Sequence, residues 1–94
     1  MREITDEKLE KYFNITKEAL DKAKAAEKTD KRADDVLDMA ERYYNDAKHF
    51  KEQGNIVNAF AALNYAHGWL DSGARAGFYK VNDSRLFTVD DVSN

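Results

Sequence analysis

The chain contains no cysteine and no proline, and it has only four glycines among its 94 residues. Without cysteine it can form no disulfide, no thiolate metal site and no thiol nucleophile. Proline and glycine are the residues that most often interrupt helices, and the first glycine is Gly54. The frequent Ala, Leu, Lys and Glu then favour an all-helical chain.

Long apolar runs are also lacking. No run approaches the roughly 20 residues of a membrane span, and residues 1–8 contain no apolar core of a signal peptide. We therefore expect a cytoplasmic protein without membrane contact. The net charge is −3, whereas a phosphate backbone is bound by a concentrated positive field. This charge disfavours nucleic acid as the main partner.

A single domain, residues 1–94, is expected, because a chain of this length supports one modest core. Apolar residues recur at intervals of three and four, which predicts helices over about 5–26, 31–53 and 56–76. Gly54 and Asn55 leave almost no connection between the last two helices, so these should lie antiparallel. The predicted fold class is all-α, an antiparallel three-helix bundle with a C-terminal extended strap over 78–94.

The third predicted helix is apolar on two sides, and such a helix is usually covered on both. One side contains Leu63 and Leu70 and is assigned to the core. The other side is assigned to an interaction surface that binds a protein partner or a second copy, and it comprises Tyr65, Trp69, Ala62 and Gly73. In the alternative, the tail covers this side through Leu86, Phe87 and Val89.

Two histidines with neighbouring acids raise the possibility of a metal site. His49 and His67 should differ by roughly 10 Å along the hairpin axis, whereas ligands of one metal lie about 2 Å from it. We therefore expect no metal and no cofactor. His67 is interpreted as a hydrogen-bonded residue of the core whose partner is Asn64, Asp71 or an acid of the second helix. The remaining glycines do not form a phosphate loop.

One long motif is specific enough to suggest a family. It runs from Ala40 to Gly77 and includes the string Tyr-Ala-His-Gly-Trp-Leu-Asp at 65–71. With Leu86-Phe87-Thr88-Val89, it resembles the archaeal Domain of Unknown Function 357 family over about residues 33–89. The resemblance implies an all-helical bundle in an archaeal cytoplasm and no known activity. Polar positions of its pattern that merit testing are Asp46, Asn58, His67, Asp71 and Arg75. The candidate polar cluster comprises Asp46, Asn64, His67, Asp71 and Arg75.

The sequence thus favours a non-enzymatic module for protein–protein interaction or self-association through the third helix. One alternative is a nucleic-acid-associated accessory of RNA processing, which would use the basic residues of the first helix, Lys8, Lys11, Lys17, Lys22, Lys24, Lys28, Lys31 and Arg32. A weaker alternative is an enzyme that uses His67, Asp71 and Arg75.

Overall fold

Three helices make up most of the chain: α1 (Asp6–Ala25), α2 (Arg32–Glu52) and α3 (Ile56–Arg75). They are seen in a computed structural model that describes residues 4–87. Within these residues there are no strands, only an isolated bridge between Lys28 and Tyr79. The predicted all-α class with three helices is therefore confirmed for the described part of the chain. No helix in 4–87 is long and apolar enough to cross a membrane.

Two of the three helices, α1 and α3, begin at residues that suit a helix start. The hydroxyl of Thr5 accepts a hydrogen bond from the Lys8 backbone at 3.0 Å, and the side chain of Asn55 accepts one from the Asn58 backbone at 3.2 Å. These bonds satisfy backbone donors that have no partner inside the helix. At the end of α2, Gly54 adopts a φ of 77°, a left-handed conformation that glycine reaches without steric cost. Two long helices therefore meet at a turn of very few residues.

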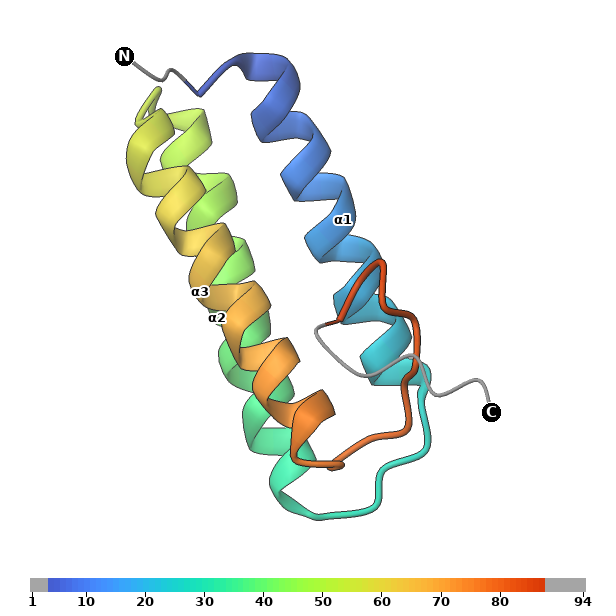
Figure 1. Cartoon of the computed structure of the whole chain (residues 1–94). Coiled ribbons are helices and arrows are strands. Elements are labelled where there is room, and N and C mark those ends of the chain that lie inside the picture. Colours follow the sequence, from blue (N-terminus) through green and yellow to red (C-terminus); the bar gives the residue numbers. More distant parts are fainter. Residues whose placement is uncertain (1–3, 88–94) are drawn as a thin grey trace.

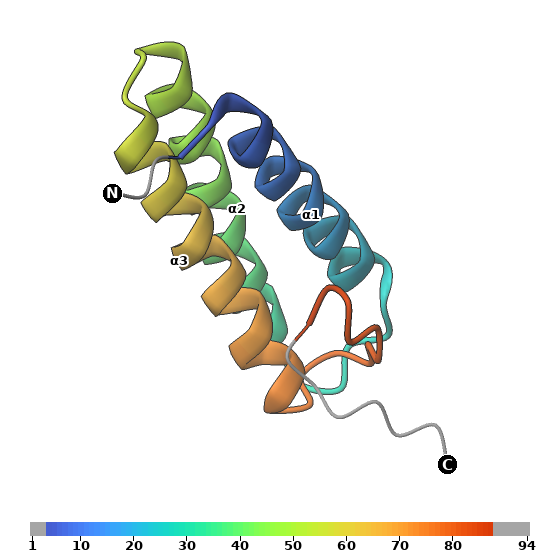
Figure 2. The same cartoon turned by 45° about the horizontal axis from the view of Figure 1, so that its top comes forward.

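The chain runs along α1, returns along α2 and then runs along α3 in the direction of α1 (Figure 1). Small buried residues, Ala59, Ala62, Ala66 and Gly73, lie along α3. Small residues let helix backbones approach, and α2 and α3 are the most extensively packed helix pair. After α3 the chain turns at Gly77, and the segment 78–87 folds back toward α1 (Figure 2).

The buried side chains form two clusters. The turn-side cluster lies near the Gly54 end and contains Leu9, Phe13, Ala47, Ala59, Ala62 and Leu63. The tail-side cluster lies at the opposite end and contains Ala19, Leu20, Ala23, Ala33, Val36, Leu37, Ala40, Leu70, Ala74, Tyr79, Leu86 and Phe87. Residues after α3 thus complete the core that the helices alone leave open.

Tyr79 shows how closely this returning segment fits. Its ring is 1% exposed, and its hydroxyl donates a hydrogen bond to the Leu70 carbonyl. A Cβ atom at Gly73 would lie only 2.5 Å from the Tyr79 hydroxyl oxygen, so the glycine makes room for the ring. Backbone hydrogen bonds from Thr29 to Phe78 (2.9 Å) and from Lys80 to Glu27 (3.0 Å) hold the segment beside the α1–α2 connection. The predicted strap beyond residue 87 lies outside the described residues.

Candidate functional site

A groove between α1, α3 and the segment 84–87 gathers part of the predicted polar cluster. Its volume is about 410 Å³, and it is lined by Tyr12, Ile15, Thr16, Leu63, Asn64, His67, Gly68, Asp71 and Arg85. Asn64, His67 and Asp71 are one helical turn apart on α3, so their side chains share its groove-facing side. Of the five predicted cluster residues, the structure brings these three together.

Within this groove, His67 is bonded to the returning segment. Its Nε2 atom lies 2.5 Å from the Leu86 carbonyl oxygen and 3.9 Å from Oδ1 of Asp71. A carbonyl oxygen only accepts hydrogen bonds, so Nε2 carries the hydrogen of the shorter contact. The sequence predicted a partner in Asn64, Asp71 or an acid of α2, but the nearest partner is a backbone carbonyl that is remote in sequence. His67 thus holds the segment 78–87, here called the tail, against α3.

Ion pairs fasten the same segment to α1. The guanidinium of Arg85 donates to both carboxylate oxygens of Glu18, at 2.6 and 3.3 Å, and Lys22 donates to Asp83 at 3.1 Å. The Arg85 hydrogen bond lowers the pKa of Glu18 below its ordinary value of 4.5. The Lys22 hydrogen bond likewise lowers the pKa of Asp83 below 3.8. In their ionised form, both carboxyl groups therefore stabilise the position of the segment 78–87 against α1.

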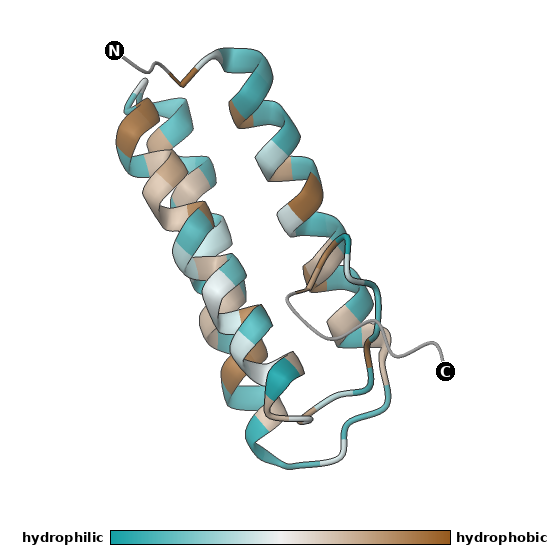
Figure 3. Cartoon of the chain, viewed as in Figure 1, coloured by the Kyte–Doolittle hydropathy of each residue, from teal (hydrophilic) through white to brown (hydrophobic). Residues whose placement is uncertain are grey.

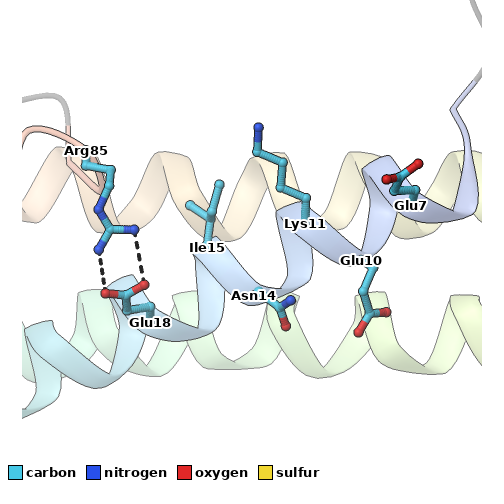
Figure 4. A pocket seen from close by; sticks show the side chains of 7 residues that line it. All are labelled: Glu7, Glu10, Lys11, Asn14, Ile15, Glu18 and Arg85. Atoms are coloured by element: carbon cyan, nitrogen blue, oxygen red, sulfur yellow. Dashed lines mark hydrogen bonds and ion pairs between the residues drawn. The ribbon is translucent and has the colours of Figure 1, made fainter.

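A second, more open hollow of about 740 Å³ extends along α1 from Glu7 to Glu18 and Arg85. Figure 4 shows its charged side chains spread along the helix, with Arg85 reaching Glu18 at one end. Lys11 and Ile15 point to one side of α1, and Glu10 and Asn14 to the other. Because these groups do not converge on a common point, the hollow presents no set of groups for one small ligand.

The other members of the predicted cluster lie elsewhere. Asp46 is exposed on α2, and Arg75 is exposed at the end of α3; neither lines the groove. Among residues 4–87, no group of three or more His, Cys, Asp or Glu side chains is arranged to hold a metal ion.

The predicted interaction surface divides into two parts. Tyr65 is 63% exposed and stacks on Tyr43 of α2, with ring centroids 5.3 Å apart. Trp69 is half-buried and packs against the tail-side cluster. Ala62 and Gly73, in contrast, lie inside the bundle and not on its surface. The apolar side chains of α3 alone did not locate the boundary between its covered and exposed sides.

The alternative, that Leu86 and Phe87 cover the Tyr65 side, differs from the observed position of these residues. Both are buried in the tail-side cluster, and Tyr65 stays exposed in the described part of the chain. Val89 lies outside the described residues.

The sequence interpretation placed Tyr65, on the outward side of α3, in an interaction surface, but it missed that the exposed positions of this side carry no charge. Every exposed position of α1 is charged except Asn14 and Ala25, and every one of α2 except Asn45 and His49. From the start of α3 to Ser72, the exposed positions carry no charge, and we call them the uncharged strip: Val57, Asn58, Ala61, Asn64, Tyr65, Gly68 and Ser72. Figure 3 shows the corresponding contrast between a mostly teal α1 and an α3 with much white to brown. The signal was available, because residues 56–70 include no Asp, Glu, Lys or Arg.

Residues 11–79 match the family model described as "Protein of unknown function (DUF357)". The chain belongs to the DUF357 family. The family inferred from the motif is therefore confirmed over residues 33–79. The match also extends further toward the N-terminus than the motif did, through most of α1. No curated protein and no solved structure shows significant similarity to the chain.

The DUF357 match includes the polar cluster and the uncharged strip but ends at Tyr79. Leu86, Phe87 and Arg85, which complete the core and the groove, lie beyond it. The family description assigns no activity.

Proposed function

We propose that this DUF357 protein is a non-enzymatic interaction module that binds a protein partner or a second copy of itself through the uncharged strip of α3. The observation that supports this proposal is the contrast in charge. In a chain in which 35% of the residues are charged, the exposed side of one helix carries no charge over four turns. Charged residues are depleted at the centres of protein interfaces, because burying an unpaired charge is costly.

Aromatic residues give this strip an anchor. Tyr65 is exposed but held in place by its stacking on Tyr43, so its ordering costs little further entropy on binding. Beside it, a shallow hollow of about 290 Å³ is lined by Asn64, Tyr65, Gly68, Trp69 and Ser72. Tyr and Trp are the residues most often found at interface hot spots. In this proposal the scaffold is an antiparallel bundle with a C-terminal strap, and the setting is the cytoplasm.

The nucleic-acid alternative receives less support from the charges of α1. Lys17 lies 2.8 Å from Asp21, and Lys24 lies 2.9 Å from Glu41 of α2. Lys22 contacts Asp83. Carboxylates beside these ammonium groups weaken the positive field that a phosphate backbone would encounter.

Photo-cross-linking from matched positions tests the proposal. Asn14, Asn45 and Asn64 are exposed asparagines on α1, α2 and α3 respectively, and each is replaced in turn by a photo-reactive amino acid. The three full-length variants are then irradiated in cell extract and in purified form. We expect protein adducts from position 64 and few from positions 14 and 45.

A second change links the adducts to the strip. Tyr65→Ser in the position-64 variant removes the exposed ring without emptying the core, and we expect the adducts to decrease strongly. Equal adducts from all three positions, or none from position 64, would contradict the proposal.

A further inference from the structure

Gly68 lines the groove between α1, α3 and the tail, and packing does not require glycine at this position. A Cβ atom built there meets no other atom within 4 Å, whereas a Cβ at Gly73 would lie 2.5 Å from the Tyr79 hydroxyl oxygen. Glycine inside a helix is unfavourable relative to alanine, because it loses more backbone freedom on folding. No packing contact within residues 4–87 accounts for this cost. The glycine does keep this wall of the groove open.

The groove has the size and the lining of a small-molecule site. Its volume of about 410 Å³ lies within the range of roughly 300–1,000 Å³ that is usual for ligand pockets. Ile15 of α1 and Leu63 of α3 provide apolar surface, and polar groups come from all three segments, among them Tyr12, Asn64 and Arg85. Ligand pockets commonly combine an apolar wall with a few polar groups, which fix the orientation of the ligand.

The α3 wall of the groove presents hydrogen-bond acceptors in a row. Asn64, His67 and Asp71 follow one another at intervals of three and four residues, so the row is about 10 Å long. Because Nε2 of His67 donates to the Leu86 carbonyl, Nδ1 of the neutral ring is an acceptor. The side-chain oxygen of Asn64 also accepts, and the carboxylate of Asp71 serves several donors at once. This row matches an elongated ligand that carries several donors.

The cationic group of the groove is already engaged by carboxylates. Arg85 donates to both carboxylate oxygens of Glu18, at 2.6 and 3.3 Å, and lies 3.7 Å from Asp83. An anionic ligand would have to displace these carboxylates from the guanidinium, and it would approach a chain with a net charge of −3. A cationic ligand needs no such exchange, because Glu18 offsets the charge of Arg85.

An aliphatic amine has the chemical groups that this lining selects. Its ammonium groups donate several hydrogen bonds each, and its methylene stem suits the apolar surface of Ile15 and Leu63. Tyr12 adds an aromatic ring, which attracts a nearby cation. The ring is held in place by Phe60, with the two centroids 5.0 Å apart and the rings at 88° to each other.

On these grounds we infer that the groove binds a linear diamine or polyamine, with Asn64 and Asp71 as its main acceptors and Gly68 leaving room for its stem. A flexible chain loses freedom when it is bound, so we expect a Kd of about 0.1–1 mM. The inference goes beyond the proposed interaction through α3 and does not depend on it.

Titration of the isotope-labelled full-length protein with spermidine, followed by amide chemical shifts at physiological salt, tests the inference. We expect saturable shifts that concentrate at residues 12–16, 64–71 and 85. Magnesium chloride at the same ionic strength supplies positive charge without a methylene stem, and glutarate supplies an elongated anion. Neither should produce saturable shifts at these residues.

Two pairs of variants assign the binding to the groove. Asp71→Asn and Asp46→Asn each remove one carboxylate, the first from the groove and the second from the exposed side of α2. Gly68→Leu fills the groove wall, whereas Ala61→Leu adds the same side chain at an exposed position of α3 outside the groove. The first member of each pair should weaken spermidine binding at least about tenfold, and the second should change it less than about twofold.

Several outcomes would overturn the inference. An absence of saturable shifts with spermidine at about 10 mM shows that the groove does not bind amines, and saturation by glutarate shows that it selects anions. Equal weakening by both members of a pair, or shifts spread over the acidic positions of α2, shows that the attraction is only one of charge. If circular dichroism shows that Asp71→Asn does not fold, the pair Gly68→Leu and Ala61→Leu decides. The proposed function is tested separately, by photo-cross-linking.

Discussion

Exchanging each of two helix-interior glycines for alanine should change the stability of this protein in opposite directions. At Gly68 the new methyl group enters open space. Alanine is favoured over glycine in a helix by about 1 kcal/mol, so Gly68→Ala should raise the free energy of unfolding by about that amount. For a domain of this size, such a change raises the Tm by about 4–8 °C.

At Gly73 the same exchange forces a methyl group to within 2.5 Å of the Tyr79 hydroxyl and 2.6 Å of its ring. Because Tyr79 is 1% exposed, its ring cannot move aside without disturbing the tail-side cluster. Overpacking of this kind costs about 1–3 kcal/mol, and losing the hydrogen bond to Leu70 costs about 1 kcal/mol more. After the gain of about 1 kcal/mol in helix propensity, Gly73→Ala should destabilise the protein by about 1–3 kcal/mol.

Urea unfolding followed by far-UV circular dichroism measures both changes, at a protein concentration low enough to keep the chain monomeric. The two alanine variants should differ by about 2–4 kcal/mol, the sum of the two effects. In a Tyr79→Leu background the clash is relieved, so Gly73→Ala should become neutral or stabilising. If Gly73→Ala is as stable as Gly68→Ala in the presence of Tyr79, the segment 78–87 does not pack against α3 as described.

Three further predictions concern the tail and the surface. Glu18 and Asp83 have lowered pKa values in the folded state, so the stabilisation by their ion pairs is present above pH 4.5 and is lost as the pH falls through the folded pKa values. Proteolysis of the segment 78–87 should accelerate as the pH falls through these values, and a proteolysis rate that stays the same between pH 6 and pH 3 would argue against these ion pairs. Phe87 is 2% exposed, so Phe87→Ala should cost about 3–5 kcal/mol in urea unfolding, and a near-neutral effect would show that the tail is not part of the core. RNA binding measured by fluorescence anisotropy should be weak and salt-sensitive; sub-micromolar binding at physiological salt, lost on reversing Lys17 and Lys24, would favour the nucleic-acid alternative.

Much of the helical architecture was readable from the sequence, because its signals are local. The three-four spacing of apolar residues, the absence of proline and the Gly54-Asn55 pair predicted helices over about 5–26, 31–53 and 56–76. The observed bounds of α1, α2 and α3 lie within one residue of these ranges. Helix formation depends on neighbouring residues, so local patterns are sufficient to indicate it.

The candidate site was harder to predict from the sequence, because it joins segments that are far apart in the chain. The sequence pointed to Asn64, His67 and Asp71 as neighbours on one helix. It did not indicate that Arg85 and the Leu86 carbonyl would close the groove around them. The tail carries no regular periodicity, so its place in the core follows from the space that three helices leave unfilled.

The residue pattern alone shows that α3 is apolar on more than one side and has no Asp, Glu, Lys or Arg from residue 56 to residue 70. Which side is covered follows from the packing of the helices in three dimensions. Ala62 and Gly73 face inward, whereas Ala61, Tyr65 and Gly68 face outward. The rotation of a helix about its own axis depends on the shapes that pack against it, here α2 and the Tyr79 ring. For that reason two glycines of the same helix have different surroundings: Gly68 faces open space, whereas Gly73 lies against the Tyr79 ring.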